Sequence, residues 1–293
     1  MSALFTGSMV ALITPFKGGK IDEAALRKLI DFQIQNGTST LVPCGTTGES
    51  ATLSHEEHDR VIEITVDQAQ KRAKVLAGTG SNSTNEAIRL TQNAKKAGAD
   101  GALLINPYYN RPTQEGLRQH FEAIAKAVDI PQMLYNIPGR TGVNMLPETV
   151  ASLAKIPNIV GIKEASGNLV QASEIIAACP KDFTLVSGED ALTWPLCAIG
   201  AQGAISVTAN ILPRLCADLW QAYSQGQLQR CRQIHDELLE INNVLFIETN
   251  PAPIKTALSL IGLCSDEIRL PLVKIKPENA EKLKSVLKKH KLL

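Results

Sequence analysis

Eight short apolar segments, many of them rich in β-branched residues, alternate with longer amphipathic segments along most of the chain. This alternation is typical of repeated βα units around a parallel sheet. The expected strands span residues 9–16, 39–44, 74–78, 101–106, 132–136, 159–163, 183–188 and 203–208. Because eight units fit a closed barrel and no GxGxxG motif follows the first strand, the sequence predicts an α/β fold of the (β/α)8 TIM-barrel type.

Helical segments fall between the expected strands and continue beyond the last one. Ser54 and Glu57 make an S-x-x-E capping box, the kind that begins a helix. Residues 225–293 have a different pattern, in which prolines separate two or three further helices. We therefore expect a barrel at residues 1–224 and a C-terminal helical appendage at residues 225–293, which packs on the barrel or makes oligomer contacts.

The charge balance argues against a role at nucleic acid or at a membrane surface. Thirty basic and 29 acidic residues give a net charge of +1, so no strongly basic surface is expected. The N-terminal apolar run lacks the preceding Lys or Arg of a secretory signal, and no stretch reaches the ~18 apolar residues of a membrane span. We expect a cytoplasmic protein that acts on small molecules.

Metal and cysteine chemistry are not favoured either. Six cysteines occur without any CxxC pair, so we expect reduced, mostly buried thiols. Cys44 lies beside a glycine-rich turn, but no base is near it in the sequence. The HEEH stretch at residues 55–58 spaces its histidines i, i+3, whereas the zinc-protease pattern HExxH spaces them i, i+4. The sequence predicts no metal site.

The stretch NIVGIKEASGN at residues 158–168 ends its apolar run with Lys163. Active sites of barrel enzymes lie at the C-terminal ends of the strands, and Lys163 is the last residue of the sixth expected strand. An exposed lysine has a pKa near 10.4, so a nucleophilic role requires burial or a nearby cation that lowers this pKa. The alternative is a lysine that extends to water or pairs with a carboxylate.

Side-chain alternation along the strand predicts which way Lys163 points. Ile159, Gly161 and Lys163 share one face, and Val160 and Ile162 share the other. Because Val160 and Ile162 suit the interface with the helices, we expect Lys163 to point into the barrel, above a glycine that leaves room for its stem. A bulky residue at position 161 is then expected to disturb the lysine before it disturbs the fold.

Polar side chains at other expected strand ends surround Lys163. Tyr135 ends the preceding strand, ~4.8 Å away, and is either an acid/base partner of Lys163 or an aromatic cap of the core. Thr46 and Thr47 lie in the turn of CGTTGES, whose backbone N–H groups suit a carboxylate. Arg140 lies in the loop NIPGRTG, where it either binds a carboxylate bidentately or is solvated.

Six motifs together resemble one known family. They are GTTGES (45–50), NPYYNRP (106–112), YNIPGRTG (135–142), GIKEASGN (161–168), SGED (187–190) and GAISVTAN (203–210). These motifs closely resemble the dihydrodipicolinate synthase family, part of the pyruvate-dependent class I aldolases, and the likeness covers nearly the whole chain. The resemblance implies a (β/α)8 barrel with a Schiff-base lysine on its sixth strand, where the strand count already places Lys163.

The resemblance implies a lyase of the diaminopimelate route to lysine, which condenses pyruvate with L-aspartate 4-semialdehyde through a Schiff base and an enamine. It implies no cofactor beyond the lysine itself. The implied catalytic residues are Lys163, Tyr135, Thr46 and Tyr109, and the implied substrate-binding residues are Thr47, Arg140, Gly188 and Ile205. In this family the residue matching Tyr109 crosses a subunit interface, which implies a homotetramer built as a dimer of dimers.

The resemblance also implies feedback inhibition by L-lysine at a dimer interface. The implied effector-binding residues are Ser50, Ala51, His55, His58, Asn82, Glu86 and Tyr108. A carboxylate at Glu86 suits the ammonium group of the effector, and Glu86 also stands at the N3 position of a capping box that begins at Ser83. The two roles are compatible.

Two other functions stay open at the level of the sequence. One is another enzyme of the superfamily, an N-acetylneuraminate lyase or a 2-keto-3-deoxy sugar acid aldolase, with the same lysine and a different electrophile. The other is a non-catalytic small-molecule sensor on the same barrel. Arg140 favours an aldehyde that bears a carboxylate. The joint presence of Lys163, Tyr135, Thr46 and Tyr109 argues against the sensor.

Overall fold

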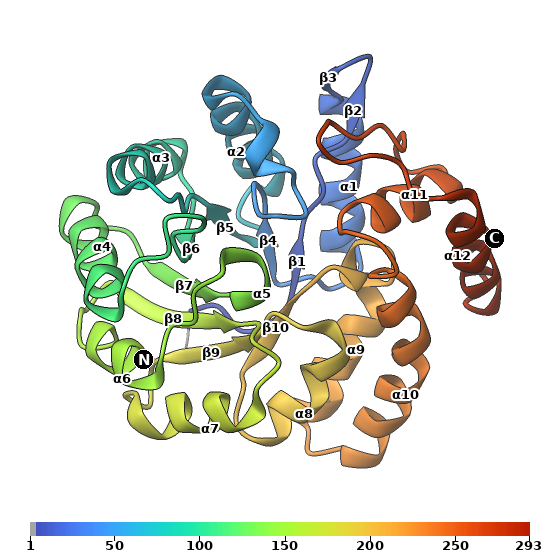
Figure 1. Ribbon diagram of the computed structural model, residues 1–293. Coiled ribbons are helices and arrows are strands. Elements are labelled where there is room, and N and C mark those ends of the chain that lie inside the picture. Colours follow the sequence, from blue (N-terminus) through green and yellow to red (C-terminus); the bar gives the residue numbers. More distant parts are fainter. Residues whose placement is uncertain (1–3) are drawn as a thin grey trace.

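The computed structural model describes residues 4–293, so residues 1–3 of the expected barrel lie outside the described residues. Eight parallel strands close into a barrel, and helices cover its outside (Figure 1). The strands follow chain order around the barrel, and β10 pairs with β1 to close it. They are β1 (Gly7–Ala11), β4 (Thr40–Val42), β5 (Lys74–Gly78), β6 (Gly101–Ile105), β7 (Gln132–Asn136), β8 (Ile159–Glu164), β9 (Thr184–Ser187) and β10 (Gly203–Ser206). The predicted TIM barrel is confirmed.

A helix of the outer layer follows each barrel strand. These helices are α1 (Glu23–Gln35), α2 (His55–Ala69), α3 (Thr84–Ala97), α4 (Gln114–Ala127), α6 (Pro147–Leu153), α7 (Leu169–Ala178), α8 (Thr193–Ala198) and α9 (Pro213–Ser224). The capping box predicted at the start of α2 is present. The Ser54 hydroxyl accepts from the Glu57 N–H, and the Glu57 carboxylate accepts from the Ser54 N–H at 3.0 Å. Short turns of helix, α5 (Pro138–Thr141), η1 (Ser50–Thr52), η2 (Asp190–Leu192) and η3 (Thr208–Asn210), lie in the loops after the strands.

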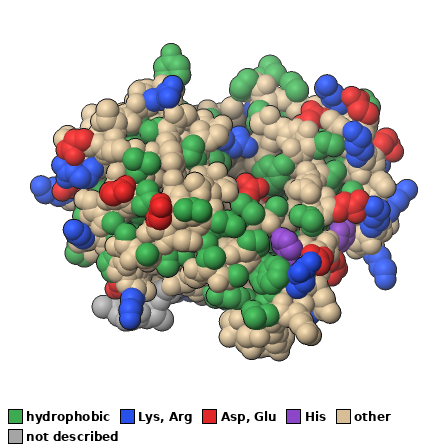
Figure 2. Space-filling view, turned by 60° about the horizontal axis from the view of Figure 1, so that its bottom comes forward, with side chains coloured by type: hydrophobic (Ala, Val, Ile, Leu, Met, Phe, Trp, Pro, Cys, Tyr) green, Lys and Arg blue, Asp and Glu red, His purple; other side chains and the backbone are tan. Residues whose placement is uncertain are grey.

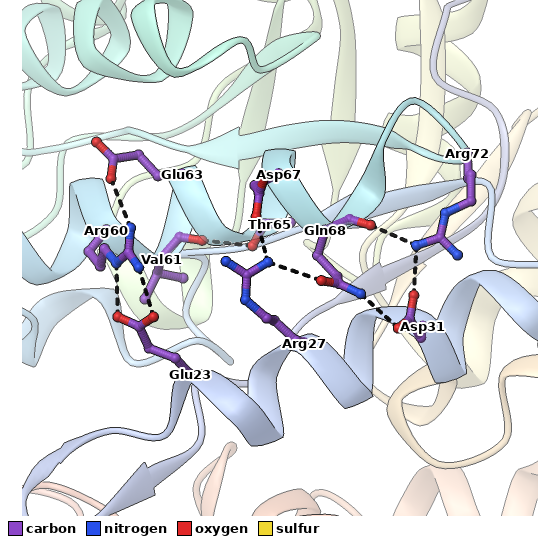
Figure 3. Close-up of polar contacts among 10 residues, drawn as sticks. All are labelled: Glu23, Arg27, Asp31, Arg60, Val61, Glu63, Thr65, Asp67, Gln68 and Arg72. Atoms are coloured by element: carbon purple, nitrogen blue, oxygen red, sulfur yellow. Dashed lines mark hydrogen bonds and ion pairs between the residues drawn. The ribbon is translucent and has the colours of Figure 1, made fainter.

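Surface ion pairs join neighbouring helices of the outer layer, as α1 and α2 illustrate (Figure 3). Arg60 on α2 donates to both carboxylate oxygens of Glu23 on α1, at 2.8 and 2.7 Å. Arg72 donates to Asp31 at 2.6 Å. Because these side chains are a third or more exposed, each pair contributes at most about 1 kcal/mol. Apolar packing, rather than these pairs, therefore holds the helices on the barrel.

The first expected strand differs most from the structure. The sequence predicts a strand over residues 9–16, but β1 stops well short of this, and a separate hairpin of β2 (Phe16–Lys17) and β3 (Lys20–Ile21) follows. Beyond β1 the Ile13 N–H donates to the Asn210 side chain at 3.2 Å instead of to a neighbouring strand. The segment stays buried, and burial alone does not reveal where strand pairing ends. The other seven strands match their expected ranges to within two residues at each end.

A β-bulge decides which side chains of β8 face the barrel interior. Gln132 of β7 pairs with Ile159 of β8. The next residue of β7, Met133, pairs with Gly161, so Val160 is an extra residue in β8. Val160 packs with the interior apolar cluster, and Ile159 packs with the cluster beneath the helices. The predicted sides of these two residues are therefore wrong, because the sequence does not reveal a bulge.

Beyond the bulge the predicted alternation holds. Ile162 belongs to the cluster beneath the helices. Lys163 pairs in register with Tyr135 on β7 and Val186 on β9, and both of these belong to the interior cluster. Because residues in register on adjacent strands share a face, Lys163 points into the barrel.

Three more helices follow the eighth βα unit. They are α10 (Leu228–Val244), α11 (Ala252–Leu260) and α12 (Pro277–Lys289). They lie beside α9 and α1 on one flank of the barrel (Figure 1). Leu258 and Leu283 of these helices belong to the same apolar cluster as Val10 and Leu26 of the barrel, so packing is continuous across the expected boundary at residue 224. A division into barrel and appendage stays a prediction.

The surface carries mixed charges. Figure 2 shows Lys and Arg side chains interspersed with Asp and Glu side chains on both flanks of the viewed face, which agrees with the net charge of +1. Within residues 4–293, no helix combines the length and the apolar character needed to cross a membrane.

Replacement of Gly161 by alanine is expected to destabilise the barrel itself. A Cβ there would lie 2.4 Å from the Thr184 carbonyl oxygen and 3.1 Å from Thr184 Cβ on β9, so the paired strands must shift apart. Overpacking of this kind costs about 1–3 kcal/mol of unfolding free energy. Denaturant-induced unfolding measures it, with Gly139→Ala as the control, since nothing lies within 4 Å of a Cβ at that position. Equal stabilities of the two variants would contradict the prediction.

Candidate active site

Lys163 and Tyr135 meet at the carboxyl ends of two adjacent barrel strands. Both side chains are buried, each with 6% exposure, because both point into the barrel mouth. Lys163 Nζ lies 4.2 Å from the centre of the Tyr135 ring. The structure thus brings together the two residues for which the sequence predicts the roles of nucleophile and acid/base partner, and it buries both of them.

Gly188, after β9, leaves the space that the Lys163 stem occupies. A Cβ at Gly188 would lie 2.9 Å from Lys163 Cε and 3.1 Å from Lys163 Cγ. Sequence reasoning assigned this role to Gly161, and the structure corrects that assignment, since the atoms nearest to a Cβ at Gly161 belong to Thr184. Gly161 and Lys163 do share a face, as predicted, but the lysine stem lies against the segment after β9, which single-strand alternation does not reveal.

Burial lowers the pKa of Lys163 to about 8, because the charged amine loses its hydration. The charges of Asp190 and Glu189 raise this pKa again, and the charge of Arg140 lowers it further. At pH 7.5 about a quarter of an amine with this pKa is neutral, against about 0.1% of an exposed lysine. The environment of Lys163 therefore favours a nucleophile over a lysine that extends to water.

Burial has the opposite effect on the neighbouring phenol. It raises the pKa of Tyr135 to about 12, while Arg140 and a hydrogen bond with Thr46 pull that pKa down. The phenol consequently keeps its proton at neutral pH and can donate it. Thr46 lies in the turn after β4, so this contact brings a third predicted catalytic residue to the lysine and tyrosine.

Asp190 is a residue of the site to which sequence reasoning gave no role, although the motif SGED contains it. Its carboxylate is buried and accepts hydrogen bonds from the Ser206 hydroxyl and, at 2.8 Å, from the Val207 N–H. Burial raises the pKa of Asp190, and these hydrogen bonds and the charge of Lys163 lower it. The negative charge of Asp190 favours the charged amine and so limits how far burial lowers the pKa of Lys163. Only the three-dimensional arrangement reveals it.

The turn at residues 45–49, after β4, carries Thr46 and Thr47. The turn is closed by the Gly48 N–H, which donates to the Gly45 carbonyl at 3.1 Å. Thr47 is buried, and its hydroxyl accepts a hydrogen bond from Asn250 Nδ2 at 3.0 Å. Sequence reasoning missed Asn250, because a contact between positions so far apart in the chain leaves no local signal.

The remaining predicted site residues lie in different surroundings. Ile205 on β10 is buried in the interior cluster. Arg140 is exposed on α5, and its Nη2 donates to the Asn250 carbonyl at 3.4 Å. Tyr109 has a left-handed backbone, with φ of 70°, and is 91% exposed. A single chain therefore does not bury Tyr109 against the other catalytic candidates.

Some of the predicted effector residues form a hydrogen-bonded cluster on α2 and α3. His55 Nε2 lies 2.9 Å from Glu86 Oε1, and the Ser81 hydroxyl donates to the other oxygen of Glu86. These contacts lower the pKa of Glu86, with Ser81 contributing most. The Ser83 hydroxyl accepts from the Glu86 N–H as predicted for a cap, but the Glu86 carboxylate contacts Ser81 and His55 instead of closing the box.

The other predicted effector residues are buried to different degrees and have other partners. Tyr108 is 37% exposed, and burial raises its pKa, with the Glu86 charge adding to the shift. His58 is buried with Nε2 2.9 Å from the Gly78 carbonyl, and burial lowers its pKa. Ser50 and Ala51 begin η1, before α2, and the Asn82 carbonyl accepts from Asn110 at 2.8 Å.

Neither cysteine nor metal chemistry gains support from the site. Cys44 is buried, and burial raises the pKa of its thiol, which makes a thiolate nucleophile unfavourable. All six cysteines are free. His55 and His58 have separate partners, and within residues 4–293 no three His, Cys, Asp or Glu side chains gather as metal ligands would.

Comparison with known proteins gives full-length matches. A model described as the dihydrodipicolinate synthetase family matches residues 4–290. A protein of Geobacter sp. (strain M21) named 4-hydroxy-tetrahydrodipicolinate synthase is 57% identical over 290 residues, 99% of this chain and 100% of that protein. A solved dihydrodipicolinate synthase of Acinetobacter baumannii, complexed with pyruvate, is 45% identical with a TM-score of 0.97 and covers 99% of this chain and 100% of its own.

A second solved structure holds a different small molecule. It is a dihydrodipicolinate synthase of Cyanidioschyzon merolae with lysine bound, 40% identical, with a TM-score of 0.97 and 100% of both chains covered.

The reactivity of Lys163 is expected to rise as the pH increases through about 8. An amine-acylating reagent, followed by peptide mass spectrometry, measures this midpoint, because only the neutral amine reacts. The same peptide in the denatured protein is the matched control, and its midpoint is expected near 10.4, the value of a solvated lysine. A midpoint near 10 in the folded protein would show that burial does not depress the pKa.

Proposed function

The chain belongs to the dihydrodipicolinate synthetase family, and from this premise we propose how its residues carry out 4-hydroxy-tetrahydrodipicolinate synthase activity. That activity is a lyase reaction of the diaminopimelate route to lysine. The observation that carries the proposed mechanism is Lys163, a buried amine with a pKa of about 8 at the carboxyl end of the sixth barrel strand. Covalent catalysis by such an amine divides one difficult step into several easier ones.

Lys163 attacks the keto carbon of pyruvate and forms a carbinolamine. Loss of water then gives an imine, and Tyr135 donates the proton that the departing hydroxyl needs, with Thr46 as its hydrogen-bond partner. The positive charge of the protonated imine allows the methyl group to lose a proton, which gives an enamine. The enamine carbon adds to the aldehyde of L-aspartate 4-semialdehyde, and the amine of that substrate displaces Lys163 as the ring closes.

Two groups in the proposal bind the substrate carboxylates. Thr47 and the backbone N–H groups of the 45–49 turn receive the carboxylate of pyruvate. Arg140 receives the carboxylate of the semialdehyde, for which a guanidinium is well suited. Support for Arg140 comes from its charge, which acts on both Lys163 and Tyr135 and therefore lies near them. Gly188 and Ile205 line the pocket between these carboxylate sites.

No separate cofactor enters the proposal, because the imine supplies the electron sink and Tyr135 supplies the proton transfers. The proposal also includes a homotetramer, built as a dimer of dimers, and a location in the cytoplasm. Within this assembly Tyr109 enters the site of a neighbouring subunit. Its 91% exposure supports this, because a solvated tyrosine has no obvious role in the isolated chain.

The proposal extends to inhibition by L-lysine at the His55, Ser81 and Glu86 cluster. Glu86 binds an ammonium group of the effector through charge-assisted hydrogen bonds. Two observations support this site. The carboxylate of Glu86 faces other polar side chains instead of capping its own helix, and the solved structure from Cyanidioschyzon merolae has lysine bound.

Pyruvate followed by borohydride is expected to add one reduced pyruvate to the peptide that contains Lys163. The Lys163→Ala variant is expected to fold, to lack the adduct and to lose turnover at least about 1,000-fold, because the covalent route is removed. Lys17→Ala, at an exposed position, is the control for a general effect of losing a lysine. Absence of the adduct in the unmodified protein would exclude the Schiff base. An adduct without turnover of the semialdehyde would favour a sugar acid lyase.

Glu86→Gln is expected to raise the L-lysine concentration for half-maximal inhibition by about 10-fold or more, since the side chain keeps its shape and loses its charge. Initial rates at fixed pyruvate and varied lysine measure the effect. Glu63→Gln, at an exposed position on α2, is the matched control. Unchanged inhibition in Glu86→Gln would place the effector elsewhere.

A further inference from the structure

Residues 250–255, the sequence NPAPIK, reach the 45–49 turn from the distant end of the chain. Asn250 is buried and donates to the Thr47 hydroxyl at 3.0 Å. Lys255, at the other end of this segment, donates to Glu49 Oε1 at 2.5 Å, and both side chains are only 1% exposed. The segment therefore contacts the turn at two points, one on each side of Gly48.

Glu49 has a backbone conformation that only the surrounding contacts can maintain. Its φ is 55°, in the left-handed region that non-glycine residues seldom occupy. Its N–H donates to the Thr46 carbonyl at 3.1 Å, so the orientation of Glu49 bears directly on Thr46. Its carboxylate accepts from Lys255 on one oxygen and from the Arg269 N–H on the other, at 3.1 Å. These contacts hold the turn in its observed shape.

Lys255 is itself held in one place. Its Nζ lies 4.2 Å from the centre of the Phe16 ring, and the Arg269 guanidinium lies 4.2 Å from the same ring. A buried ion pair is a poor source of net stability, because removing both charges from water offsets most of their attraction. The Lys255–Glu49 ion pair is therefore better explained by the restraint that it places on the shape of the turn than by a gain in stability.

We propose that residues 250–255 are a positioning element for the reaction, in which Lys255 acts through Glu49, and Asn250 through Thr47, to shape the pyruvate-binding turn. This inference rests on the proposed role of Thr46 and Thr47. Lys255 is a positioning residue and not a second nucleophile, since its amine donates to Glu49 and the residue is buried.

The inference separates the two half-reactions. The turn receives pyruvate before the semialdehyde enters, so loss of its shape lowers kcat/KM for pyruvate. Arg140, which receives the semialdehyde, donates a hydrogen bond to the Asn250 carbonyl, at 3.4 Å, and not to the Asn250 side chain. A change of the Asn250 side chain leaves that carbonyl in place. The effect on kcat/KM for the semialdehyde is therefore small.

Two variants of the full chain test this inference. Asn250→Ala removes the donor to Thr47. The double variant Glu49→Gln with Lys255→Met removes both charges together, because Lys255→Met alone would leave a buried carboxylate uncompensated and threaten folding. Each variant is expected to lower kcat/KM for pyruvate about 10-fold, while kcat/KM for the semialdehyde changes less than about 2-fold. At saturating pyruvate, borohydride is expected to trap the adduct at Lys163 to full stoichiometry.

Leu258→Ala is the matched control, since Leu258 is fully buried on the same helix, α11, and its apolar side chain makes no hydrogen bond to the turn. It is expected to lower the melting temperature without changing kcat/KM for pyruvate. An equal loss in Leu258→Ala would overturn the inference, because loose docking of α11 would then suffice. Unchanged kinetics in both test variants would also overturn it and leave the Schiff-base mechanism intact. Failure of the unmodified protein to form the adduct would overturn both proposals.

Discussion

Enclosure of the Lys163 amine in the barrel mouth is the interaction on which the rest of the site depends. Removal from water disfavours the charged amine and the charged phenolate alike. It therefore lowers the pKa of Lys163 to about 8 and raises that of Tyr135 to about 12. One physical cause thus favours both proposed roles at neutral pH, a nucleophilic amine at Lys163 and a protonated phenol at Tyr135, with Lys163 Nζ 4.2 Å from the centre of the Tyr135 ring. Asp190, itself buried and hydrogen-bonded, keeps the shift of the lysine moderate.

Segments from opposite ends of the chain make this enclosure. Gly188, after β9, leaves room for the lysine stem, and Thr46, after β4, contacts the phenol. Residues 250–255, which lie beyond the last βα unit, donate hydrogen bonds to the turn that carries Thr46. The C-terminal helices therefore have a connection to the chemistry that their composition, typical of packing helices, does not indicate. Closure of the barrel alone would leave Glu49 without the partner that holds its left-handed backbone.

Particular residues show how far sequence reasoning extends. Strand counting places Lys163 on the sixth strand and pairs it with Tyr135, because apolar runs and their order survive in the fold. Alternation fails at Val160, since a bulge is a property of two paired strands and not of one sequence. The space for the Lys163 stem comes from Gly188 and not from Gly161, because the stem lies against a residue of another segment, which alternation within one strand does not indicate. Asp190 and Asn250 received no role, because each acts through a contact with a separate segment of the chain. Ser81 received none either, although its partner Glu86 begins the next helix, because no motif marks the contact between their side chains.

Local patterns in the amino-acid sequence are sufficient for the barrel, the family and the choice of Lys163 as the proposed nucleophile, because hydrophobic periodicity and strand-end motifs are encoded residue by residue. Tertiary structure alone decides the ionisation of Lys163, the glycine that accommodates it and the partners that hold the 45–49 turn. Each of these depends on distances between residues far apart in the chain and on the removal of water, which arise only when the barrel closes and its mouth is covered.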